Sequence, residues 1–170
     1  VTESRTALHF EIMRTDSLGI RQGGTTGQRI ALPDLPLRHA DGSPNDALVA
    51  AYSALHDRTV NIADAYAEKG FDFSGTRAFD QRTGYRSQSF LTVPMKNHDG
   101  ALIGVLQLLN ALDPETGQVV AFSEADQSLT ESLASQAAIA LSNRLLITQL
   151  ERLFESFVKL INIAIDEKSP

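Results

Sequence analysis

The chain has 170 residues, of which 42% are hydrophobic and 21% charged, so it can build a core and does not have the composition of a disordered protein. Its net charge of −6 and the lack of a dense lysine and arginine run argue against nucleic-acid binding. It has no cysteine and no apolar run of about 20 residues, which excludes disulfides, thiolate metal sites, cysteine nucleophiles and a bilayer-spanning helix. We therefore expect a cytoplasmic fragment without membrane contact.

The N-terminal third mixes one strand pattern with a long loop. Apolar and polar side chains alternate over Leu8–Ile12, which predicts a half-buried strand. Residues 19–46 are rich in glycine, proline, threonine and aspartate, which predicts a loop with at most one short strand, Arg29–Leu32. Asn45 or Asp46 can cap the helix that follows, and its apolar face is formed by Leu48, Ala51, Tyr52 and Leu55.

The middle of the chain predicts a lid followed by a hairpin. After a short strand, Arg58–Ile62, residues 64–87 mix aromatic and polar side chains, and we expect an irregular lid with a short helix over Gly75–Arg82. The strands Ser89–Met95 and Ala101–Leu109 are joined by a tight turn that ends in Asp99-Gly100. The second strand is apolar on both faces, which predicts a position in the middle of a sheet.

A helix without glycine or proline extends from residue 124 to residue 166. Ser123 and Asp126 form a capping-box-like start. A heptad seam continues for about five repeats and predicts a coiled coil or bundle, and with it a homodimer; its members are Leu129, Leu133, Gln136, Ala140, Asn143, Ile147, Leu150, Phe154, Phe157, Ile161 and Ala164. Packing on its own domain suits residues 124–143 but not the second half, because so long a helix extends beyond a domain of this size.

Four blocks of sequence, residues 60–66, 79–87, 93–97 and 104–110, together resemble the GAF domain, and most of all the cyclic-nucleotide type found in phosphodiesterases and adenylate cyclases. The resemblance implies an α+β fold with a central antiparallel sheet, helices on one face, and a ligand pocket and lid on the other. The Asn-Lys…Phe…Asp-Glu signature of that group is only partly present. Asn110, Phe122 and Asp126 match it, whereas Ala111 replaces the lysine that pairs with the aspartate and Gln127 replaces the glutamate.

The resemblance also implies a set of ligand-binding residues. Backbone groups at Ile62 and Ala63 would hold a base, Asp80, Thr83 and Ser87 would surround a phosphoribose, and Gln107 would face the pocket from the sheet. Nearby Arg77, Arg82 and Arg86 could add charge-assisted bonds to a phosphate. The alternative is structural: Asp80 caps a helix, and Thr83-Gly84 shapes its exit.

The C-terminal stretch looks like the lead-in to an HD-type, HD-GYP-like metal-dependent phosphohydrolase. We therefore divide the chain into a GAF sensory domain (1–123), a long helix (124–166) and the start of a missing catalytic domain (167–170). We expect no catalysis, required cofactor or metal site in the fragment itself, since His56-Asp57 and His98-Asp99 lack the spacing of a metal site. Two functions stay open: a sensor for a small molecule such as a cyclic nucleotide, and a dimerisation scaffold with a vestigial pocket. A free methionine sulfoxide reductase is excluded because that chemistry needs cysteines.

Overall fold

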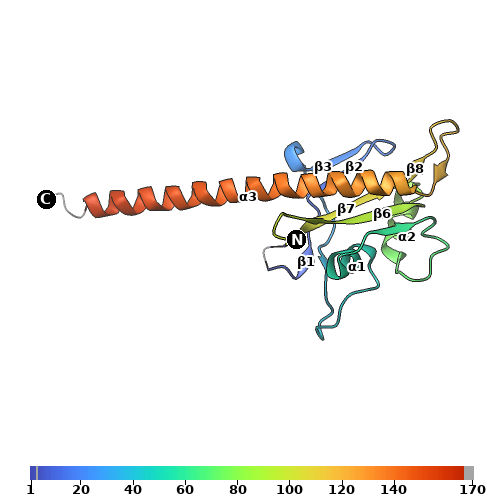
Figure 1. Cartoon of the computed structure of the whole chain (residues 1–170), viewed down its shortest axis with the longest axis horizontal. Coiled ribbons are helices and arrows are strands. Elements are labelled where there is room, and N and C mark those ends of the chain that lie inside the picture. The colour runs from blue at the N-terminus through green and yellow to red at the C-terminus, as the bar shows by residue number, and fades with distance from the viewer. Residues whose placement is uncertain (3, 167–170) are drawn as a thin grey trace.

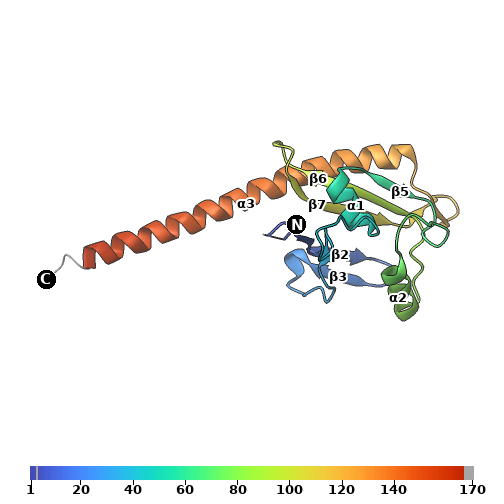
Figure 2. The same ribbon diagram turned by 90° about the horizontal axis from the view of Figure 1, so that it is seen from below.

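The computed structural model describes residues 1–2 and 4–166 and has the α+β fold that the sequence predicts. A three-stranded antiparallel sheet lies at the centre, in the order β5 (Val60–Ile62), β6 (Phe90–Lys96) and β7 (Leu102–Leu109). The long helix α3 (Glu124–Asp166) runs along one face of this sheet, and α1 (Val49–His56) lies on the other face (Figures 1 and 2).

Strand β6 is the middle strand and carries the core to both faces of the sheet. On one face Leu91, Val93 and Met95 pack against two alanines of α3. On the other face Phe90 packs with the cluster Val49, Ile62, Ala65 and Phe73. This alternation follows from the period of two along a strand, and it explains why β6 is buried along most of its length.

The prediction that Ala101–Leu109 lies in the middle of the sheet is wrong, because β7 is an edge strand. Leu108 and Leu109 near its end are 36% and 38% exposed. Apolar residues on both sides of a strand indicate that its two faces are covered, whereas its place in the sheet depends on backbone pairing along its edges. The sequence pattern reports only the first of these.

The predicted strand Leu8–Ile12 is divided between two small sheets. β1 (Ala7–Leu8) pairs with β4 (Leu35–Pro36), whereas β2 (Ile12–Thr15) pairs with β3 (Ile20–Gly23). Arg29–Leu32 is not a strand, although Ile30 is buried. The short helix η1 (Gly24–Thr26) follows β3 directly. Gly23, the last residue of β3, has a φ of 75°, and an added Cβ there would lie 1.9 Å from the carbonyl oxygen of Glu11.

The predicted cap of α1 is also wrong, since Leu48 occupies the N-cap position without a side-chain hydrogen bond. Asn45 instead donates from Nδ2 to the carbonyl oxygen of Pro36, at 2.9 Å. The carboxylate of Asp46 lies 2.7 Å from Nε2 of His56 at the other end of the helix. Both side chains therefore bind groups that are distant in the sequence, and neither caps the helix as its local position predicted.

Other local predictions are confirmed. α2 (Ser74–Thr83) forms in the lid, and the turn between β6 and β7 places Gly100 at a φ of 75°. A further hairpin that the sequence did not indicate, β8 (Ala111–Leu112) with β9 (Val119–Val120), connects β7 to α3. α3 begins with the predicted capping box: the Asp126 carboxylate accepts from the Ser123 backbone N–H at 2.9 Å, and the Asp126 N–H donates to the Ser123 hydroxyl at 3.1 Å.

The first half of α3 contacts the sheet through small residues spaced by four, not through the heptad seam. Thr130, Ala134, Ala138 and Ser142 are buried. With 3.6 residues per turn, consecutive residues are about 100° apart, so Leu129 and Leu133 project to the side of the buried stripe, where they are 62% and 52% exposed. The helix then continues far beyond the rest of the chain (Figure 1). The large apolar residues of the seam are therefore exposed from Leu129 to Ile161, including the part of the helix that covers the sheet.

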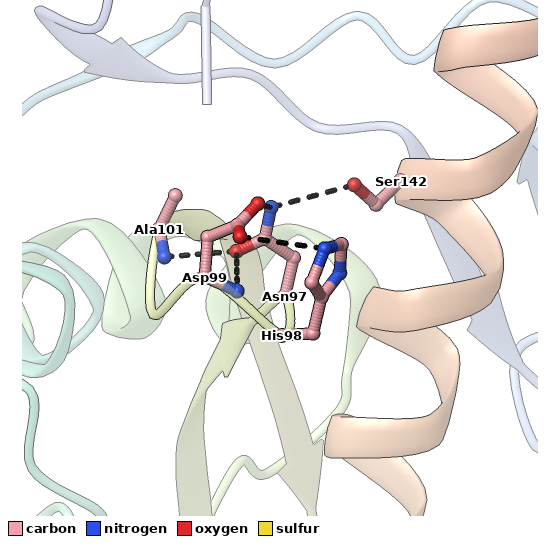
Figure 3. A network of polar contacts seen from close by, with 5 residues as sticks. All are labelled: Asn97, His98, Asp99, Ala101 and Ser142. Carbon is pink, nitrogen blue, oxygen red and sulfur yellow. Dashed lines mark hydrogen bonds and ion pairs between the residues drawn. The ribbon is translucent and has the colours of Figure 1, made fainter.

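The turn between β6 and β7 reaches α3 near the point where the helix leaves the domain. The Asn97 side-chain oxygen accepts from the backbone N–H groups of Asp99 and Ala101, at 3.1 Å and 2.9 Å. Its Nδ2 lies 3.5 Å from the hydroxyl of Ser142, and His98 Nε2 lies 3.3 Å from Asp99 Oδ1 (Figure 3). The second His-Asp pair therefore belongs to a turn.

Within residues 1–2 and 4–166, no helix is long and apolar enough to cross a membrane. The expected start of a downstream domain at residues 167–170 lies outside the described residues.

Candidate ligand-binding site

The lid is held by one buried carboxylate, that of Asp80 on α2, which is 3% exposed. One oxygen accepts from the Tyr66 hydroxyl and from the Ser87 backbone N–H, both at 2.7 Å. The other oxygen accepts from the Ser87 hydroxyl at 2.8 Å. Three donors from two segments thus satisfy the charge that burial would otherwise penalise. The carboxylate fixes the start of the lid to its end.

Tyr66 lies beneath two arginines. The Cζ atom of Arg86 is 4.2 Å from the centroid of the Tyr66 ring, and that of Arg77 is 5.7 Å from it. The hydrogen bond to Asp80 raises the pKa of Tyr66 above its usual value, because it stabilises the protonated phenol, and desolvation adds to this effect. Tyr66 is therefore a neutral aromatic platform that carries two cations.

Asn110 ties the end of the lid to the end of β7. Its side-chain oxygen accepts from the Gln88 N–H at 2.7 Å, and its Nδ2 donates to the Tyr85 hydroxyl and to the Arg86 carbonyl oxygen, both at 2.8 Å. Its φ is 59°, a conformation that asparagine tolerates better than most side chains. This geometry gives the first residue of the partial Asn…Phe…Asp signature a structural role.

The structure brings together two of the six predicted site residues, Asp80 and Ser87. Ile62 is the last residue of β5 and is buried in the core, and Ala63 follows it on the surface. The Thr83 hydroxyl donates to the carbonyl oxygen of Phe79 within its own helix, at 2.9 Å. These contacts fit the structural alternative for Asp80 and Thr83 in part, since Asp80 joins lid segments and does not cap a helix.

Gln107 is exposed on β7 and stands opposite Thr92 on β6. Its Nε2 donates to the Thr92 hydroxyl at 2.9 Å. Side chains of directly paired residues point to the same face, so Gln107 lies on the face that carries Phe90, the face of α1 and the lid. Among the described residues, it has no hydrogen bond to Asp80 or Ser87. Its role toward a ligand remains a prediction.

Sequence reasoning did not assign Tyr66 and Asn110 to the site. Tyr66 is separated from Asp80 by 14 residues, and no local period connects them. The signal that could have found Asn110 is an asparagine at the end of a strand, where a positive φ often occurs.

Two other kinds of site are not supported in the part of the chain that the structure describes. No group of three or more histidine, aspartate or glutamate side chains there could hold a metal ion. A groove of about 200 Å³ lies beside α3, lined by Thr59, Val93, Pro94, Lys96, Glu131 and Ser135. Typical small-molecule pockets measure about 300–1,000 Å³, so this groove is smaller than the usual site of a nucleotide-sized ligand.

Comparison with known proteins matches residues 5–141 to the family model described as "GAF domain". The chain is 31% identical over 118 residues to the dual 3′,5′-cyclic-AMP and -GMP phosphodiesterase 11A of Takifugu rubripes, and 34% identical over 95 residues to the dual phosphodiesterase 11 of Drosophila melanogaster. These alignments cover 69% and 56% of this chain but only 12% and 6% of the relatives. The chain therefore corresponds to a small part of each relative.

Among solved structures, the GAF domain of a phosphoenolpyruvate-protein phosphotransferase from Coxiella burnetii is 16% identical, with a TM-score of 0.41. The superposition covers 60% of this chain and 56% of that chain.

Proposed function

This chain belongs to the GAF domain family, and on that premise we propose that it is a regulatory module that binds a small molecule, a cyclic nucleotide being the first candidate, and controls a phosphohydrolase domain further along the same protein. The relatives named above are phosphodiesterases of cyclic AMP and cyclic GMP, and they support the nucleotide candidate. The HD-type identity of the downstream domain rests on the sequence resemblance alone.

The observation that carries the binding role is the lid held by Asp80. The carboxylate joins Tyr66 to Ser87 while the guanidinium groups of Arg77 and Arg86 stay at the surface. Because the buried Asp80 carboxylate is hydrogen-bonded to both ends of the lid, it fixes the segment after α2 in one geometry. The two guanidinium groups then face outward. Preorganised groups of this kind bind at a lower entropic cost.

Output through a dimer is supported by the open seam of α3. Seven large apolar seam residues are between 41% and 68% exposed: Leu129, Leu133, Ile147, Leu150, Phe154, Phe157 and Ile161. An apolar stripe of this length on a protein surface marks an interaction site, and its heptad spacing suits the same helix of a second copy. The helices of the pair would carry the state of the lid onward.

The test is isothermal titration calorimetry of the chain with cyclic AMP and with cyclic GMP, with Gln107→Ala as a variant on the sheet. The proposal expects saturable binding of at least one nucleotide and weaker binding by the variant. No heat at millimolar ligand would remove the nucleotide candidate.

The second candidate function is a dimerisation scaffold whose pocket is vestigial. It is favoured by Ala111, which replaces the lysine of the cyclic-nucleotide signature, and by Asp80, whose hydrogen bonds are all made within the chain. In that case the calorimetric titrations stay flat, while the chain still forms the dimer.

A further inference from the structure

We infer that Arg77 and Arg86, placed over the Tyr66 ring, form the anion-binding part of the lid and that the ligand of this domain carries a phosphate or similar oxyanion there; this inference rests on the proposed function. The sequence named Arg77 and Arg86, together with Arg82, only as additional donors beside six site residues, and of those six only Asp80 and Ser87 hydrogen-bond in the network that holds Tyr66.

Among the described residues, the two arginines over Tyr66 have no acidic partner bonded to them. Neither guanidinium forms an ion pair within 4.0 Å or a side-chain hydrogen bond with any residue that the structure describes. The Asp80 carboxylate has both oxygens engaged by Tyr66 and Ser87. A second acid, Asp72, lies near Arg77: its pKa is lowered chiefly by hydrogen bonds with Ser74 and to a smaller extent by the charge of Arg77. Neither acid is hydrogen-bonded to a guanidinium, so the N–H groups of both arginines are available to an anion.

The aromatic ring beneath the cations is held in place. The Tyr66 hydroxyl is fixed to buried Asp80, so the ring cannot easily turn away. The Arg86 carbonyl oxygen accepts from Asn110, which fixes the backbone from which this arginine extends. Stacking on an aromatic ring satisfies the face of a guanidinium and leaves the N–H groups at its edge free to bind.

The chemistry of the two guanidinium groups indicates the ligand that fits. Planar guanidinium edges match two oxygens of a phosphate or a carboxylate in a bidentate manner. A cyclic phosphodiester carries a single negative charge and has two oxygens outside its ring that can accept such bonds. Both arginines are exposed and lie close to the Tyr66 ring, and in the inferred site one phosphate at the edge of this ring receives bonds from both.

The experiment records the arginine Nε–Hε signals of the chain by NMR during titration with cyclic AMP, cyclic GMP, adenosine and inorganic pyrophosphate. We expect the signals of Arg77 and Arg86 to shift with the anions and not with adenosine. Arg82 lies on the same helix but not over the ring, so its signal is the internal control. Arg77→Gln and Arg86→Gln should each weaken binding of the anions about tenfold, and Arg82→Gln should not.

The outcomes separate this inference from the proposed function. Nucleotide binding that is equal in the wild type and in both arginine variants overturns the anion site and leaves the sensor proposal intact. Pyrophosphate binding that depends on both arginines, without binding of either cyclic nucleotide, supports the anion site and removes the nucleotide candidate. If no anion of the panel shifts these two signals, the anion site is wrong. Arg86→Lys, which keeps the charge but not the planar fork, should bind the anions with intermediate affinity.

Discussion

Replacement of Asp80 tests the anchor of the lid most directly. In Asp80→Ala the buried N–H and hydroxyl of Ser87 lose their acceptor, and so does the Tyr66 hydroxyl. A buried donor left unsatisfied costs about 1–3 kcal/mol. Tyr66 is only half-buried and can turn to water, so we count the two groups of Ser87. The free energy of unfolding should fall by about 3 kcal/mol in Asp80→Ala.

Asp80→Asn is the matched control because it keeps the shape and one acceptor oxygen. The Ser87 hydroxyl can then accept from the new amide, so each group in the network keeps a partner. What is lost is the charge assistance of the hydrogen bonds, so the cost should be about 1–2 kcal/mol. Urea unfolding monitored by circular dichroism measures both variants. Equal midpoints for the wild type and Asp80→Ala would refute the anchor.

The same anchor predicts a pH dependence through Tyr66. Its pKa is raised above the usual value of 10.0, chiefly because its hydroxyl donates to Asp80. A group whose pKa is higher in the folded state stabilises that state fully below its unfolded pKa, and the contribution is lost as the pH rises through the folded pKa. As the pH rises through the pKa of Tyr66, the free energy of unfolding should therefore fall less in Tyr66→Phe than in the wild type. A spectrophotometric titration that gives the same tyrosine pKa values in the wild type and in Asp80→Ala, which removes the acceptor, would contradict this.

Three further perturbations test other parts of the structure. Gly23→Ala should lower the free energy of unfolding by more than Gly19→Ala, because both have a positive φ but only the first places its Cβ against a neighbouring backbone carbonyl; urea midpoints in the reverse order would contradict the geometry. Asn110→Gly keeps the positive φ but loses the bonds to the lid, so hydrogen exchange over residues 64–88 should accelerate about tenfold or more, whereas unchanged exchange would show that those bonds do not hold the lid. Leu150→Lys, in the seam, should convert a dimer into monomers in sedimentation, while Lys159→Glu, outside it, should not; equal behaviour of the two variants would exclude the seam as the contact.

The elements that the sequence predicted correctly are those whose signals are local. The turn at Asp99-Gly100 needs only its own backbone conformation, and the start of α3 needs only Ser123 and Asp126, three residues apart. The extent of α3 followed from the absence of glycine and proline. Such features are encoded within a few residues and do not depend on what surrounds them.

The elements that the sequence did not predict depend on distant partners. Asn45 and Asp46 have the chemistry of caps, but Pro36 and His56 take their side chains. β7 has the composition of a central strand and lies at an edge, because pairing is decided by the whole sheet. In the site, the resemblance placed Asp80 and Ser87 around a phosphoribose, whereas their hydrogen bonds with each other, and that of Asp80 with Tyr66, became visible only in the fold.

The attachment points of the lid bear on how a signal would reach the helix. Ile62, Phe90 and Leu109 are paired across the sheet, so the residues just beyond them lie at one end of it. Asn110 holds the lid there, and at the same end Asn61 donates to the carbonyl oxygen of Phe122, at 3.0 Å, just before α3 begins. The lid and the start of α3 are therefore attached at the same end of the sheet, away from the exit of α3 near Ser142.

The contact surface between α3 and the sheet bears on how easily the helix can shift along the sheet. The side chains that α3 buries there are small, Ala134 and Ala138 among them, so few large groups interlock to resist a shift of the helix along the sheet. A ligand can move this equilibrium only by its difference in affinity for the two arrangements, with couplings of about 1–3 kcal/mol being typical.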